Sequence, residues 1–449
     1  MNQTIAQILQ EFTLDNYRPI IPRALDLGTP LIPRAGNLVK VVTGMRRSGK
    51  SYRLFQEIDA LLNAGVPPKR ICYINFEDDR LGAVTARTGD EVIDTFRYLN
   101  APDEREGLYL FFDELQEMEG WGRWLRRIVD TMRATIYVSG SSSKMLSSEI
   151  ATEFRGRALE FELLPYSFYE VVRTDAVLGP HVGDEVQPAS RRALLQARLD
   201  AYLERGGFPA VQQLPKPQAT ELLQSYVRHV VSRDVVERRD FSRPRLATAV
   251  AHRLMAMNAR ELSIRKMEND LRSAGLATGR GYLSELIGAF EEAYLLFQVR
   301  EASRALTERT TSMPKVYAID PGLALALSRA GASERGQRLE EAVYLELRRR
   351  SFGAREGTIA AHRTRKHRYE VDFAVGDVLD EAPVQLIQVT ESVENAATAQ
   401  RETRALWEAL DETGLDEGLL IVGSGEAAVY EHDGKRIRQI PAWSWFLQR

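Results

Sequence analysis

The residues best suited to chemistry begin with a glycine-rich run at positions 44–51, which reads GMRRSGKS. It matches the pattern G-x-x-x-x-G-K-[ST], in which backbone N–H groups surround a phosphate group. Such a loop needs a strand before it and a helix after it. The apolar residues 38–43 and the helix-compatible residues 52–62 meet both requirements. The spacing therefore predicts a phosphate-binding loop.

Each residue of this loop, together with the one that follows it, is expected to contact a nucleotide. The glycines let the backbone approach the phosphates closely. Lys50 is placed to reach the β- and γ-phosphates, and the Ser51 hydroxyl to ligate Mg²⁺. The predicted nucleotide-binding residues are Gly44, Met45, Arg46, Arg47, Ser48, Gly49, Lys50, Ser51 and Tyr52.

Two carboxylates follow a second apolar run, LYLFF at positions 108–112. A strand over these residues would end beside the phosphate loop. Asp113 would then hold the Mg²⁺ shell, and Glu114 would polarise the attacking water as general base. Acidic residues are common at strand ends, so it is their pairing with the loop that carries the argument. Together the two motifs predict a nucleotide hydrolase.

Serines and arginines further along could complete this site. Residues 139–143 read SGSSS, and a hydroxyl there, such as that of Ser141, could lie near the γ-phosphate. A Ser/Gly turn or a helix cap explains the run equally well. Arg155 and Arg157 could stabilise transition-state charge, supplied by a neighbouring subunit. An ordinary surface salt bridge also explains either arginine.

The elements that must position these residues alternate short apolar runs with helical segments, which is typical of a parallel α/β sheet. From about residue 190 the pattern becomes helical, interrupted by a turn signal at 205–209. Three short helices between residues 245 and 300 suit a helix-turn-helix or winged-helix unit, with Ser263 as one N-cap. The predicted strands cover residues 38–43, 70–76, 108–112, 135–139 and 158–163.

The composition limits the class of protein. The 449 residues suggest about three domains, and 60 Lys and Arg stand against 63 Asp and Glu, for a net charge of −3. A disordered or disulfide-rich chain is excluded, whereas a basic face can hide in a neutral average. The single cysteine, Cys72, is expected to be a buried strand thiol. With no signal peptide and no apolar membrane-spanning run, a cytoplasmic location is expected.

Taken together, these residues resemble the AAA+ ATPases. More narrowly, the chain is similar to a prokaryotic group with an AAA domain followed by a C-terminal domain of unknown function. The resemblance covers nearly the whole chain. The stretches that carry it include TGMRRSGKSY (43–52), FFDELQEMEGW (111–121), ERGGFPA (204–210), KVYAIDPGL (315–323) and EVDFAV (370–375).

The resemblance implies an α/β fold and a division of the chain into parts. It also implies ATP and Mg²⁺ as cofactors, a sensor at Ser139 or Ser141, and an arginine finger at Arg155 or Arg157. Homo-oligomeric rings such as hexamers are implied by analogy. The parts are a lead-in at 1–36, a parallel-sheet P-loop AAA+ core at 37–180, a helical lid at 181–242, a winged-helix-like domain at 243–332 and a PD-(D/E)XK nuclease-like domain at 333–449.

The nuclease-like part departs from the pattern that cleavage needs. Nucleases of this type require clustered carboxylates for Mg²⁺ and a lysine that assists the attacking water. Glu340 and Asp372 could supply carboxylates. The next strand should bring Glu/Gln-x-Lys but reads Gln388-Val389-Thr390, so the lysine is replaced by threonine. We therefore expect a degenerate fold that docks nucleic acid or protein without cleaving it.

The sequence thus predicts an AAA+ ATPase that uses ATP hydrolysis for conformational work, with DNA as the expected partner and no membrane association. A nucleotide-gated switch in a protein complex and an ATP-regulated nuclease stay open as alternatives. Basic residues could meet phosphates, although interleaved acids also suit a solvated face. These basic residues lie at 362–368 and at Arg260, Arg265, Lys266, Arg272 and Arg280.

Overall fold

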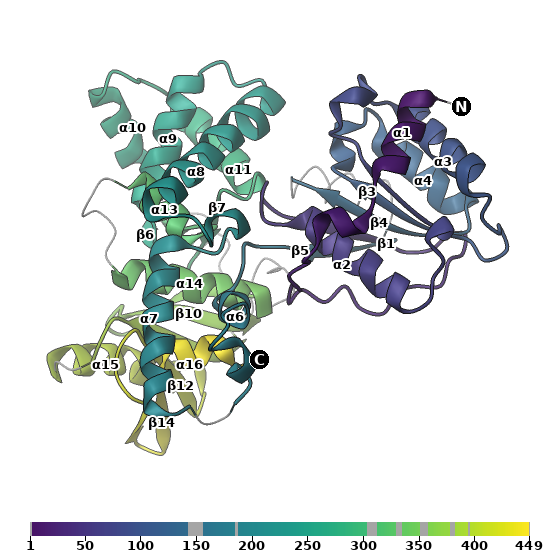
Figure 1. Cartoon of the computed structure of the whole chain (residues 1–449). Coiled ribbons are helices and arrows are strands. Elements are labelled where there is room, and N and C mark those ends of the chain that lie inside the picture. Colours follow the sequence, from purple (N-terminus) through teal and green to yellow (C-terminus); the bar gives the residue numbers. More distant parts are fainter. Residues whose placement is uncertain are drawn as a thin grey trace. The chain divides into compact units, whose positions relative to one another are not determined.

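The computed structural model describes residues 2–141, 156–184, 187–302, 312–328, 335–350, 358–377, 382–393 and 396–448. The chain divides into two compact units (Figure 1). The first comprises Met1–Leu163 with Glu292–Tyr294, and the second comprises Leu164–Glu291 and Leu295–Arg449. Within the described residues, no helix combines the length and apolar character that a membrane crossing requires.

The first unit is built on a five-stranded sheet in the order β2-β3-β4-β1-β5. Every neighbouring pair is parallel, and the four strands other than the partly exposed edge strand β5 are mostly apolar runs because both of their faces are buried. The predicted parallel α/β sheet is confirmed, with each strand end within one residue of its expected position. The strands are β1 (Val39–Thr43), β2 (Ile71–Asn75), β3 (Leu108–Asp113), β4 (Ala134–Gly140) and β5 (Ala158–Glu162).

Helices cover both faces of this sheet (Figure 1). On one face, Leu54 and Phe55 join Tyr137 in an apolar cluster. On the other face, Phe96 and Trp124 pack with strand residues of a second cluster, which also contains the fully buried Cys72. The first face is covered by α2 (Lys50–Asn63), and the second by α1 (Gln3–Glu11), α3 (Ala86–Asn100) and α4 (Trp121–Thr131).

The second unit begins with helices and a small sheet. It takes in residues 164–180, which the sequence analysis places in the core at 37–180. Among their contacts within this unit, Tyr166 N donates to Gly207 O at 2.7 Å. Ser263 caps α10 as predicted, by accepting a hydrogen bond from Lys266 N. The helices are α6 (Phe168–Arg173), α7 (Ala189–Arg205), α8 (Lys216–His229), α9 (Pro244–Ala256), α10 (Ile264–Ser273), α11 (Arg280–Glu292) and α13 (Pro321–Leu327).

Between these helices run three short strands that the sequence reading did not include. They are antiparallel and pair in the order β6-β8-β7. The element order from residue 244 is thus α9, β6, α10, α11, β7, β8. The strands are β6 (Arg260–Glu261), β7 (Leu296–Val299) and β8 (Lys315–Ala318).

A six-stranded mixed sheet forms the C-terminal part of the second unit, in the order β13-β14-β12-β11-β10-β9. Helix α15 joins β11 to the parallel β12 and packs Leu406 and Leu410 against the sheet. The elements are α14 (Arg335–Arg350), β9 (Ile359–Arg363), β10 (Glu370–Asp377), β11 (Ala382–Thr390), α15 (Ala396–Thr413), β12 (Glu417–Val422), β13 (Ala428–His432), β14 (Lys435–Pro441) and α16 (Ala442–Leu447).

The turn predicted at 205–209 is fastened to the start of α13. Gly206 has a φ of +78°, and a Cβ there would lie 1.9 Å from Asp320 Oδ1, so only glycine fits. The Asp320 carboxyl group accepts hydrogen bonds from Gly207 N at 2.5 Å and from Leu323 N at 2.9 Å. One buried carboxyl group therefore caps α13 and holds the end of α7.

This carboxyl group makes stability depend on pH. Burial raises the pKa of Asp320 from 3.8 to about 6, against the opposing effect of its backbone donors. The folded state favours the protonated form of Asp320. The contribution of this group to the free energy of unfolding is therefore complete below pH 4 and is lost as the pH rises through about 6. We expect Asp320→Asn to remove roughly 3 kcal/mol of this pH dependence. Calorimetric unfolding from pH 4 to 7 would measure it, and identical profiles for both proteins would contradict the assignment.

Candidate active site

The loop between β1 and α2 has the shape of a phosphate cradle. Gly44 has a φ of +152°, and a Cβ there would lie 2.2 Å from the carbonyl oxygen of Leu163. Gly49, in the left-handed region at +101°, is the N-cap residue that precedes α2, and Arg47 is left-handed at +69°. Ser48 is fully buried, and its Oγ has no hydrogen-bond partner among the described residues. A buried hydroxyl of this kind suits a polar ligand such as a phosphate oxygen.

The lead-in segment holds this loop from outside the motif. Arg23 is buried, and its guanidinium donates to Ser48 O at 2.8 Å. Its backbone N–H donates to Gln56 Oε1 of α2 at 2.8 Å. Sequence reasoning missed Arg23, because nothing in its neighbourhood beyond the flanking prolines marks it as part of the loop.

Asp113 ends β3 and is completely buried. Tyr73 Oη donates to its Oδ2 at 2.8 Å, and Ser139 Oγ donates to its Oδ1. The Ser51 hydroxyl is also hydrogen-bonded to it. Burial and the charge of Glu114 raise the pKa of Asp113, whereas the hydroxyl donors oppose that rise. A hydroxyl and a carboxylate side by side are hard oxygen ligands that fit Mg²⁺.

Glu114 stands next to Asp113 in a left-handed backbone conformation, with a φ of +51°. Lys50 Nζ lies 3.2 Å from its Oε1, and both side chains are buried. Gln116 Nε2 donates to its Oε2 at 2.6 Å. Burial by itself would raise the pKa of Glu114, but Lys50, Gln116 and Arg46 lower it. The carboxylate is therefore ionised and able to accept a proton.

The two candidate sensor serines lie at different distances from the acids. Ser139 Oγ accepts from Glu114 N at 3.0 Å in addition to its bond with Asp113. Ser141 Oγ is reached from Gln116 Nε2 at 3.4 Å. Gln116 thus links Glu114 to Ser141. Sequence reasoning missed it, although it follows Glu114 by only two residues.

The remaining predicted residues lie around this centre in different settings. Arg46 pairs with Glu77, and Met45 is fully buried. Tyr52 is 45% exposed. The Arg157 side chain is 51% exposed and pairs with Asp130. Arg155 lies outside the described residues.

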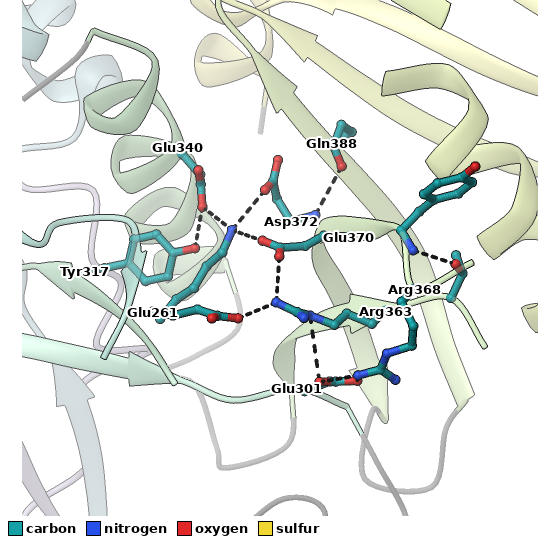
Figure 2. A network of polar contacts seen from close by, with 12 residues as sticks. Glu261, Glu301, Tyr317, Glu340, Arg363, Arg368, Glu370, Asp372 and Gln388 are labelled. Atoms are coloured by element: carbon teal, nitrogen blue, oxygen red, sulfur yellow. Dashed lines mark hydrogen bonds and ion pairs between the residues drawn. The ribbon is translucent and has the colours of Figure 1, made fainter. Parts of the chain in front are cut away.

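A second polar cluster occupies the second unit and contains the residues predicted for a nuclease (Figure 2). Lys315 Nζ lies 2.9 Å from Glu340 Oε1 and 3.1 Å from Asp372 Oδ1. Gln388 Oε1 accepts from Asp372 N at 3.2 Å. Sequence reasoning missed Lys315, which comes from a distant strand. In the part of the chain that the structure describes, no group of three or more His, Cys, Asp or Glu residues is arranged to hold a metal ion.

The basic residues considered for DNA contact differ in how far acids engage them. Arg272 and Arg280 both pair with Glu268. At 362–368, Arg363 pairs with Glu261 and Glu370, His367 with Glu408, and Arg368 with Glu301. Arg265 and Lys266 of α10 are exposed.

Comparison with known sequences agrees with the geometry of the first unit. The AAA domain family matches residues 36–172, and a domain of unknown function (DUF8612) matches residues 196–334. The AAA match implies nucleotide binding, usually with Mg²⁺. The nuclease-like resemblance of residues 333–449 finds no support in these matches.

Related proteins and solved structures extend the comparison. The uncharacterized protein MJ1544 of Methanocaldococcus jannaschii is 32% identical, over 98% of this chain and 95% of its own. An uncharacterized protein of Haemophilus influenzae is 27% identical over 75% of this chain and 79% of its own. The Walker-type ATPase of Pyrococcus abyssi aligns with 64% of this chain and 90% of its own, at 15% identity and a TM-score of 0.41, too low to carry an argument. The chain therefore belongs to the family of MJ1544 and carries the AAA domain of a P-loop ATPase.

Proposed function

We propose that the first unit hydrolyses ATP and that the energy drives conformational work on DNA. The observation that carries the ATPase assignment is the meeting of four side chains at the carboxyl edge of one parallel sheet. Lys50 contacts Glu114, and Ser51 contacts Asp113. These contacts join the phosphate loop to the acids of β3, although more than sixty residues separate them in the sequence.

The proposed roles follow from these contacts. The loop N–H groups from Gly44 to Gly49 bind phosphate oxygens. Ser51 and Asp113 would hold Mg²⁺, which would neutralise phosphate charge. Lys50 turns from Glu114 to the phosphates. Glu114, still oriented by Gln116, then accepts a proton from the attacking water. Ser139 fixes both acids through its hydroxyl.

An arginine from a neighbouring subunit would complete this site. Arg157 supports the idea because its side chain is half exposed and its partner, Asp130, is exposed as well. Exposed ion pairs contribute little to stability, so Arg157 can exchange Asp130 for a phosphate at low cost. Arg155 stays a candidate on sequence grounds. A ring, with its ATP sites between subunits, remains part of the proposal.

The second unit supplies the parts proposed to meet DNA. Its order of α9, β6, α10, α11, β7 and β8, with an antiparallel three-stranded sheet, supports a winged-helix-like domain at 243–332. The exposed Arg265 and Lys266 of α10 are the cations best placed for phosphate contact. The order of α14, three antiparallel strands, α15 and a parallel β12 supports a degenerate nuclease-like domain at 333–449.

DNA dependence of the ATPase rate tests this proposal. We expect single-stranded, duplex or branched DNA to raise the rate of ATP hydrolysis several-fold at low salt. Arg265→Glu/Lys266→Glu should weaken that stimulation without changing the basal rate. Lys216→Glu, at an exposed lysine of α8 in the same unit, is the matched control. A basal ATPase that no DNA accelerates would contradict the motor and favour the nucleotide-gated switch.

A further inference from the structure

The most unusual buried group outside the ATP site is the ammonium of Lys315 on β8. Three carboxylate oxygens surround its Nζ: Glu370 Oε1 at 2.6 Å, Glu340 Oε1 at 2.9 Å and Asp372 Oδ1 at 3.1 Å. The side chains of Lys315 and Asp372 are only 9% and 8% exposed. An ammonium has three N–H donors, so three acceptors match its full capacity.

Further polar atoms of this cluster are also hydrogen-bonded. Tyr317 Oη donates to Glu340 Oε1 at 2.7 Å, and Val389 N donates to Asp372 Oδ2 at 2.9 Å. The carboxamide of Gln388 is occupied as well, because its oxygen accepts from Asp372 N and its Nε2 donates to Glu402 at 2.7 Å. The amide oxygen that could have ligated a metal is turned to the backbone instead.

We propose that the Lys315 ammonium is the resident cation of this carboxylate site and takes the place of a divalent metal. Three carboxylates gathered at one point, of which Asp372 is buried and Glu340 and Glu370 are partly buried, need a compensating positive charge. In this chain the charge comes from Lys315, a side chain of β8, and not from a bound ion. The site therefore needs no metal, and the C-terminal sheet does not cleave phosphodiester bonds. This inference does not rest on the ATPase function of the first unit.

The cluster has a mechanical role in the second unit. Lys315 belongs to the sheet β6-β8-β7, whereas Glu340 is on α14 and both Glu370 and Asp372 are on β10. Figure 2 shows a second link beside it, in which Arg363 of β9 pairs with Glu261 of β6 and with Glu370. The two links fasten the three-stranded sheet to the six-stranded sheet at the point where a nuclease would hold its metal.

Removal of the ammonium tests the proposal. In the full chain without nucleotide, Lys315→Met should lower the thermal unfolding midpoint by about 10 °C, because the buried Asp372 and the two partly buried glutamates lose their cation. Millimolar Mn²⁺ should restore part of that loss, and the restoration should vanish in Lys315→Met/Asp372→Asn. Lys315→Arg keeps the positive charge, so its unfolding midpoint should fall by less than that of Lys315→Met. Wild-type protein should show no shift with Mn²⁺.

Each other outcome overturns the proposal. An Asp372-dependent shift of the wild-type midpoint with Mn²⁺ would show that a metal binds beside Lys315. Plasmid cleavage that Asp372→Ala abolishes would show an active nuclease, and a Lys315→Met variant that Mn²⁺ fails to rescue would show that a divalent ion cannot replace the ammonium. If Lys315→Met does not fold, titration of the wild type and of Glu370→Gln with Mn²⁺ decides. Mn²⁺ binding that depends on the half-buried Glu370 contradicts the proposal, and a wild type that does not bind Mn²⁺ in this way supports it.

Discussion

Glu114→Gln is expected to lower ATP turnover at least ~100-fold while leaving ATP bound, because general-base catalysis contributes about 10²–10⁴ in rate. Glutamine keeps the shape of the side chain and a hydrogen-bonding oxygen, but it cannot accept a proton from water. In the wild type, Gln116 donates to one carboxylate oxygen and Lys50 contacts the other, so the variant keeps an acceptor for only one of these two donors. Single-turnover hydrolysis and retention of labelled ATP on the protein would measure the two effects separately.

The matched control for this variant is Glu117→Gln. Glu117 lies three residues further on, is about one-third exposed, and approaches Arg46 only at 3.9 Å. Its substitution should leave turnover within about twofold of wild type, since exposed ion pairs contribute little. Equal turnover in Glu114→Gln and wild type would remove Glu114 from the reaction.

The second large effect is expected for Lys50→Ala, which should abolish measurable turnover and weaken ATP binding. The side chain is buried, and its only described contacts are Glu114 Oε1 and, at 3.5 Å, the Met45 carbonyl oxygen. Its removal takes away the positive charge that would face the phosphates and leaves Glu114 without its buried cation. Both consequences oppose binding of a polyanion.

Fluorescence titration with a labelled ATP analogue and a phosphate-release assay would measure this loss. Lys69→Ala, at an exposed lysine of the same unit, should behave like wild type. Thermal unfolding of both variants would distinguish loss of nucleotide binding from loss of the folded structure. Normal turnover by a folded Lys50→Ala protein would mean that the loop at 44–51 is not the catalytic site.

The sequence predicted those parts of the fold that depend on local pattern. Each strand of the first sheet lies within one residue of its expected range, and the four strands other than the edge strand β5 are buried, mostly apolar runs, as parallel strands require. The contact between Lys50 and Glu114 follows in the same way, since parallel strands bring their carboxyl ends to one edge.

The residues that sequence reasoning missed act through tertiary contact. Arg23 supports the loop from an irregular segment, and Lys315 reaches its carboxylates across two sheets. Neither has a fixed spacing from the residues it serves, so no pattern could pair them. Thr390 stands where the nuclease pattern has a lysine, and the sequence alone shows that departure. The charge that occupies the cluster instead could be seen only in three dimensions.

The hydrogen bond from Arg23 to the Ser48 carbonyl oxygen has a consequence for how the ATPase is delimited. The segment recognised as an AAA domain starts at residue 36, thirteen positions after this arginine. A fragment cut at that recognised start would keep every nucleotide-binding motif and still lose the group that fixes the middle of the phosphate loop. The functional boundary of the nucleotide site therefore lies upstream of its recognisable boundary, and substitutions in the first thirty-five residues can act as active-site substitutions.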